Sequence, residues 1–123
     1  MYCNSDTTGS NYYSHLLFGS GSAAGAAADA GVNSYGMPIA VTGATNVTTS
    51  FAPFVIDILD YANTSKNKTV RSLHGVEDNA NGQMRLRSGL WASTAAINSL
   101  TFQGGDAGVF FQQYSSFALY GIK

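Results

Sequence analysis

The stretch FVIDILDYANTSKNKTVRSL, residues 54–73, decides the fold class. Its two arms, residues 54–61 and 68–73, are rich in the β-branched and aromatic residues that favour strands. The polar residues 62–67 between them are typical of a turn, so the pattern predicts an antiparallel hairpin. Apolar side chains occupy both faces of the first arm, and we therefore expect that strand to be central in a sheet and covered on both sides.

Five more stretches have the period-two alternation or the composition of a strand: residues 12–18, 34–42, 83–87, 97–102 and 114–122, with residues 46–51 as a weaker candidate. In residues 83–87 the alternation predicts that Met84 and Leu86 point inward and that the two arginines point outward. Residues 114–122 (YSSFALYGI) are expected to form a closing strand that is held in a sheet.

Residues 20–31 consist mostly of small residues interrupted by Gly21 and Gly25, and we expect a loop there. The chain thus offers seven strands and no convincing helix. Charged residues make up only 11% of it, against about a quarter in ordinary domains. We predict an all-β fold with a single domain over residues 1–123, an antiparallel β-sandwich of jelly-roll type.

Charge and hydropathy exclude two classes of partner. A net charge of −1 provides no long-range field for nucleic acid, and the pair Arg85 and Arg87 is too small to follow a phosphate backbone. No apolar run approaches the ~20 residues of a membrane span, so we expect no membrane insertion. Cys3 is the only cysteine, which excludes a disulfide within the chain.

The sequence contains no constellation of residues that would support catalysis or metal binding. His15, His74 and Cys3 lack the spacing of metal ligands, and neither a nucleophile elbow nor a phosphate-binding loop is present. Glycoside hydrolysis uses a pair of acids, and the sequence contains no such paired-acid motif. We therefore expect no enzyme, no catalytic or metal-binding residue and no cofactor.

Asp57 lies between Ile56 and Ile58 in the apolar first arm of the hairpin. A carboxylate buried there without a partner would cost several kcal/mol, so it needs one. The hairpin places Asp57 opposite Ser72 or its neighbour Arg71. We expect a structural pair with Arg71; the alternative is a ligand-binding or catalytic acid.

Trp91 lies in the segment SGLWAST (residues 88–94) between two predicted strands. We expect it to be structural and to pack over one end of the core. In the alternative interpretation, exposed aromatic rings stack on a sugar, and the glycan contacts are then Tyr12, Tyr35 and Trp91.

Residues 53–73, 88–97 and 114–122 together resemble a family of tailed-bacteriophage virion structural proteins. The shared pattern is an IDILDY strand, a polar turn, a return strand with arginine, an SGLW segment and a closing SSFALYGI. The resemblance implies a location in the virion, as a capsid decoration, a head fibre or a tail component. It also implies contacts with other virion proteins and a symmetric homo-oligomer, with a trimer favoured, and it carries no catalytic residues.

A second function stays open beside this one: a carbohydrate-binding or receptor-binding module at a tail-fibre tip, which would recognise a host surface glycan. Members of the family begin with at least one strand before the segment that matches residues 4–18. Because a jelly roll has eight strands, we expect this chain to lack an N-terminal strand or to share one with a partner. A sheet edge would then be free to pair with a neighbouring chain.

Overall fold

The computed structural model describes residues 1–30, 36–37, 51–77, 82–104 and 111–122. These residues form seven strands and one short 3₁₀ helix: β1 (Tyr2–Cys3), η1 (Gly9–Asn11), β2 (Tyr12–Gly19), β3 (Ala24–Ala30), β4 (Phe54–Leu59), β5 (Lys68–Val76), β6 (Gln83–Trp91) and β7 (Leu100–Thr101). This part of the chain contains no α-helix, and the all-β prediction is confirmed.

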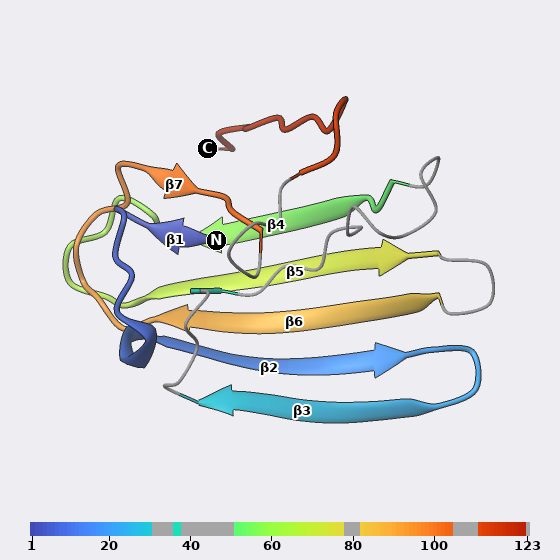
Figure 1. The fold of residues 1–123 in the computed structure, drawn as a ribbon. Coiled ribbons are helices and arrows are strands. Elements are labelled where there is room, and N and C mark those ends of the chain that lie inside the picture. Colours follow the sequence, from blue (N-terminus) through green and yellow to red (C-terminus); the bar gives the residue numbers. More distant parts are fainter. Residues whose placement is uncertain (31–35, 38–50, 78–81, 105–110, 123) are drawn as a thin grey trace.

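Five strands form one antiparallel sheet in the order β3-β2-β6-β5-β4, and β1 pairs with β7 in a separate two-stranded sheet (Figure 1). The hairpin predicted in residues 54–73 is present as β4 and β5, and β6 follows antiparallel to β5. The first arm is not central, however, because β4 is the last strand at one edge of the described sheet. The prediction of a central strand was therefore wrong.

β3 lies where the sequence predicts a loop. Gly21, with a φ of 80°, lies in the turn that reverses the chain, and the N–H of Ser20 donates to the carbonyl of Ala23 at 2.9 Å. Gly25 then pairs with Phe18, whose ring atoms come within 2.8 Å of the place where a Cβ would stand. Pairing with β2 thus overrides the low strand propensity of alanine and glycine.

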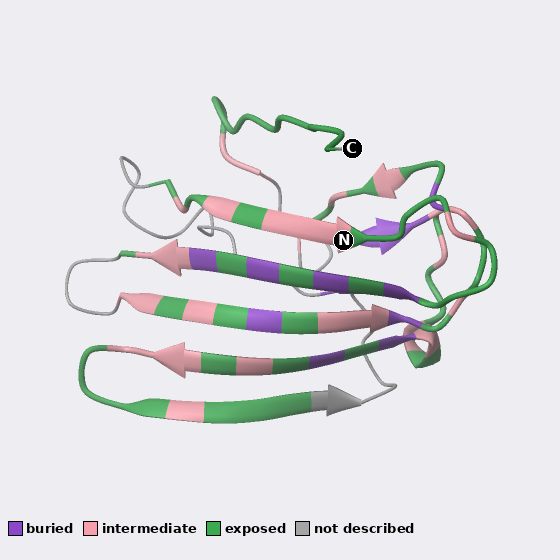
Figure 2. Cartoon of the chain, turned by 180° about the vertical axis from the view of Figure 1, so that it is seen from behind, coloured by how far each residue is buried: buried purple, intermediate pink, exposed green. Residues whose placement is uncertain are grey.

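Residues 114–122 do not form the predicted closing strand. They lie beyond the β4 edge, belong to no described strand and expose their side chains (Figures 1 and 2). The strand predicted at residues 97–102 is shorter and consists of β7 alone. The strands predicted at residues 34–42 and 46–51 fall outside the described residues, except for residues 36–37 and 51, which are not in strands.

The two faces of the five-stranded sheet differ in exposure. Alternate residues of β5 are buried and the residues between them are exposed, as the stripes in Figure 2 show. We call the buried side the inner face and the other side the outer face. The buried hydrophobic core consists of Met1, Tyr2, Cys3, Tyr12, Met37, Val70, Trp91 and Ile97.

β6 faces the opposite way from the prediction. Met84 is 64% exposed, whereas Arg87 is only 8% exposed. Leu86 pairs with Leu73 of β5 on one side and with Leu17 of β2 on the other, so the three leucines share the outer face. The alternation is present, but the register with the neighbouring strands sets its direction.

Lys68, the first residue of β5, is fully buried. Its ammonium group donates hydrogen bonds to the carbonyl oxygens of Asn63 at 2.5 Å, Lys66 at 2.7 Å and Thr94 at 3.2 Å. Three acceptors match the three donors of the ammonium group, which compensates for removing the charge from water. Lys68 thereby connects the β4–β5 turn to the segment that follows β6.

Replacing Lys68 with Met should lower the free energy of unfolding by about 1–3 kcal/mol, because three carbonyl groups lose their donor. Urea unfolding followed by circular dichroism measures the change. Lys66→Met is the matched control, since Lys66 is exposed and pairs with Asp60 at 3.4 Å; its effect should stay within about 0.5 kcal/mol. Equal effects of the two substitutions would contradict this role of Lys68.

Candidate functional site

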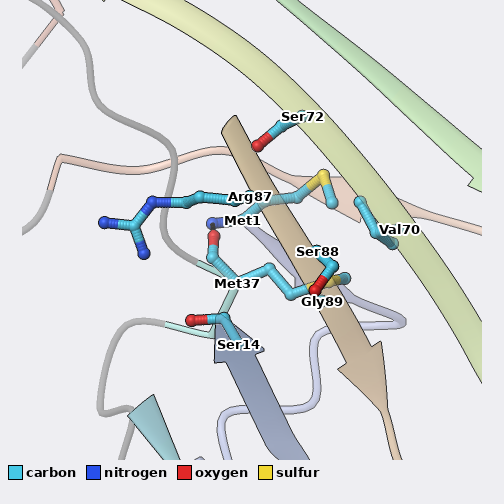
Figure 3. A pocket seen from close by; sticks show the side chains of 8 residues that line it. All are labelled: Met1, Ser14, Met37, Val70, Ser72, Arg87, Ser88 and Gly89. Carbon is cyan, nitrogen blue, oxygen red and sulfur yellow. Dashed lines mark hydrogen bonds between the residues drawn. The ribbon is translucent and has the colours of Figure 1, made fainter. Parts of the chain in front are cut away.

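The described ranges contain no cluster of three or more His, Cys, Asp or Glu side chains that could hold a metal ion. A small cavity lies between the inner face and the side chains of Met1 and Met37 (Figure 3). Its volume is about 10 Å³, barely enough for one water molecule, and the guanidinium of Arg87 points away from it. This cavity is too small for a substrate. In the part of the chain that is described, no helix has the length and apolar character of a membrane span.

His74 is a buried imidazole on β5, and neither of its ring nitrogens has a hydrogen-bond partner. Arg85 lies opposite it on β6, Arg87 follows on the same side of that strand, and Phe54 is its neighbour on β4. Burial, and to a smaller extent the charges of Arg87 and Arg85, lowers the pKa of His74 to about 4. The imidazole is therefore neutral at pH 7.

Asp6 connects the N-terminal segment to one end of the five-stranded sheet through hydrogen bonds. Its carboxylate accepts hydrogen bonds from Trp91 Nε1 at 2.8 Å, from Asn11 Nδ2 at 2.8 Å and from the N–H of Thr8 at 3.0 Å. Burial alone would raise the pKa of Asp6, but these hydrogen bonds outweigh it and lower the pKa to about 2. The carbonyl of Asp6 also accepts a hydrogen bond from the Tyr12 hydroxyl at 2.9 Å.

Burial decides whether the aromatic residues expected as glycan contacts can bind a sugar. Tyr12 and Trp91 are 0% and 3% exposed, so neither ring can stack on a sugar in this structure. Tyr35, the third residue predicted as a glycan contact, lies outside the described residues. Trp91 ends β6 opposite Tyr12 of β2 and packs at one end of the core.

The outer face carries most of the exposed apolar side chains of the sheet. Antiparallel register places its side chains in rows that run across β2, β6, β5 and β4. The leucine row contains Leu17, Leu86, Leu73 and Val55. The tyrosine row contains Tyr13, Leu90, Thr69 and Leu59. The middle row between them is polar and contains His15, Ser88, Arg71 and Asp57.

Asp57 and Arg71 form an ion pair in the middle row. Arg71 donates hydrogen bonds to Oδ2 of Asp57 from Nη2 at 2.7 Å and from Nε at 3.1 Å. The structure thus places the two residues predicted as a pair directly opposite each other. The expected burial was wrong, because the side chains of Arg71 and Asp57 are 72% and 44% exposed. An ion pair this exposed contributes little to stability.

The outer face is the candidate site that the sequence does not reveal. Its one local signal is the apolar character of both faces of residues 54–61, which is equally consistent with a strand covered on both sides. Leu17, Leu73 and Leu86 meet only through the register of three separate strands. No local pattern encodes that register.

The buried His74 should make stability depend on pH. The unfolded chain protonates this histidine below about pH 6.5, whereas the folded chain does so only near pH 4. The free energy of unfolding should therefore fall as the pH decreases through this interval. Melting temperatures at about pH 6 and about pH 4.5 measure the effect, because the Met1 amino group, whose pKa burial lowers to about 6, changes stability mainly above that pH. His74→Leu should remove most of the change in this range. Asp6 does not interfere, because its contribution is lost only below about pH 4. An unchanged pH dependence in the variant would contradict this assignment.

Asp57→Ala should lower the free energy of unfolding by no more than about 1 kcal/mol, because the ion pair that it removes is exposed to solvent. Urea unfolding of the variant and the parent at equal protein concentration measures the difference. A loss of 2 kcal/mol or more would show that the carboxylate has a role that the single chain does not display.

Comparison of this chain with models of protein families, with curated proteins and with solved structures gave no match.

Proposed function

We propose that this chain is a non-enzymatic structural protein of a tailed-phage virion, a capsid decoration, head fibre or tail component that works as a symmetric homo-oligomer. The observation that carries the proposal is the outer face, where apolar side chains of four strands are open to solvent. Two rows of exposed apolar side chains lie on either side of the polar middle row, and large apolar patches on a protein surface mark sites of protein association.

The C-terminal segment, residues 111–122, which is exposed from residue 113 onward, also supports assembly. Phe117 packs against Phe54, Phe102 and Phe111, with ring centroids 5.6, 5.1 and 5.1 Å away. Leu119 and the residues that follow it make no such contact and are exposed. An extended apolar segment that is anchored at one point is suited to contact a neighbouring subunit.

The virion assignment itself rests on the resemblance in residues 53–73, 88–97 and 114–122. The low charge of the chain, 11% Asp, Glu, Lys and Arg with a net charge of −1, is compatible with close packing of identical subunits. A trimer is the symmetry that the resemblance implies. The jelly-roll sandwich belongs to the same proposal: further chains in the particle would supply the layer that the outer face lacks.

A carbohydrate-binding module at a tail-fibre tip is the weaker alternative. Two of its three expected glycan contacts, Tyr12 and Trp91, are buried in the core and donate hydrogen bonds to Asp6. A glycan site would have to use other rings, such as Tyr61, which is exposed.

The test is to locate the chain in purified tailed-phage particles whose genome encodes it. Mass spectrometry of the particles should detect it in several copies, and cryo-electron microscopy should show it as symmetric density on the head or the tail. Absence from particles that are otherwise complete would overturn the proposal. Binding of the isolated chain to host polysaccharide, without a place in the particle wall, would favour the glycan-binding alternative.

A further inference from the structure

We propose that the outer face is the contact surface for a second copy of this chain, so that two five-stranded sheets face each other and form a two-fold symmetric β-sandwich. A contact of this kind does not require a location in the virion. It rests on the exposure, the area and the symmetry of the outer face.

The exposure is concentrated on the side chains that would form the core of a sandwich. Val55 is 63% exposed and Leu73, on the strand beside it, is 48% exposed. Leu17 and Leu86 continue the same row across the sheet and are exposed as well. Aligned side chains of this type fill the space between two sheets about 10 Å apart. On a single chain they remain open to solvent.

The area reaches the lower limit for a specific interface. Strands lie about 4.8 Å apart and alternate residues about 6.8 Å apart, so five strands and three rows span a flat footprint of about 24 by 20 Å, or roughly 500 Å². Side chains roughen this surface, so its accessible area is larger. Two such faces together reach at least about 1,000 Å², where specific interfaces begin.

The pattern of the outer face is complementary to itself. The polar middle row lies between two largely apolar rows, so rotation by 180° about that row sets the leucine row of one copy on the tyrosine row of the other. Asp57 and Arg71 form their ion pair within one chain. Neither of them therefore needs a charged partner from the second copy. Ser88 is on β6, the central strand, and would lie opposite Ser88 of the other copy across the two-fold axis.

The C-terminal segment of the same chain fits the outer face less well. Phe117 holds it at Phe54, an inner-side position at the β4 edge, through rings 5.6 Å apart. The described residues beyond that anchor, 118–122, span at most about 17 Å when fully extended. They would have to pass around β4 first, and so could not cover β5, β6 and β2. A two-fold contact through the outer face and a threefold ring would use different surfaces, so one assembly can contain both.

The first experiment compares Leu73→Lys with Leu119→Lys by light scattering and sedimentation of the full chain at 1–100 µM. The parent should be at least dimeric. Leu73→Lys should weaken the association by at least about 100-fold, because it places a charge in the leucine row that the other copy would cover. Leu119→Lys makes the same change at an exposed position off the outer face and should leave the association unchanged.

A monomeric parent at 100 µM, or undiminished association of Leu73→Lys, would overturn the proposal. Loss of association in Leu119→Lys alone would assign the contact to the C-terminal segment instead. A location in the particle can fail while this contact stands, because it is tested separately. A monomeric parent would also remove the outer face as support for the proposed homo-oligomer.

A second variant keeps the test decisive if Leu73→Lys does not fold. Ser88→Cys replaces an exposed serine near the expected axis, and the native Cys3 is buried. A short bismaleimide should join two copies of this variant into a covalent dimer. Ser22→Cys, in the β2–β3 turn, is the matched control and should not be joined under the same conditions. Equal cross-linking of both variants, or of neither, would rule out the face-to-face arrangement.

Discussion

The pairing of β5 with β4 and β6 is the constraint on which the rest of the structure depends. β5 lies between these two strands, and its register determines which residues of all three share a face. A shift by one residue would exchange the two faces, because side chains alternate with a period of two. The same register brings Asp57 opposite Arg71, Leu73 opposite Leu86 and His74 opposite Arg85. The ion pair, the apolar outer row and the neutral buried histidine are therefore consequences of one alignment.

The inner face is unusually polar for the buried side of a sheet. Lys68, Ser72 and His74 alternate with exposed residues along β5, and Arg87 is buried on the neighbouring strand. Lys68 is compensated by three carbonyl groups, whereas the ring of His74 has no hydrogen-bond partner. The outer face, which is open to solvent, has the leucines. The inner face also buries the apolar core, including Tyr12, Val70 and Trp91. The leucines of the outer face, in contrast, add nothing to burial in a single chain, although burial of apolar surface is the main source of stability. A partner on the outer face would bury them.

A sandwich formed across two chains would also explain why each chain by itself covers so little of its five-stranded sheet. The N-terminal residues, Met37 and Ile97 contribute to the core beside the five-stranded sheet, and the second sheet, β1 with β7, has only two short strands. This small layer is too short to act as the second sheet of a sandwich, which normally matches the first in extent. A second copy would supply a layer of equal size. The sequence predicts a sandwich within one chain, whereas this sandwich would form between two chains.

The sequence by itself determined the fold class and the local hairpin. The β-branched and aromatic residues of FVIDIL and the polar turn after it encode β4 and β5 directly, and the spacing within that hairpin brings Asp57 to Arg71. Only the tertiary structure decided which side of each strand is buried. Met84 and Leu86 alternate with arginines in the sequence, but they face outward because β6 pairs with both β5 and β2. β3 likewise forms because β2 offers it a partner, and residues 114–122 remain unpaired although their pattern is that of a strand. Alternation along a strand is a local property of the sequence, whereas burial and pairing depend on contacts between residues far apart in the chain, and these exist only in the folded protein.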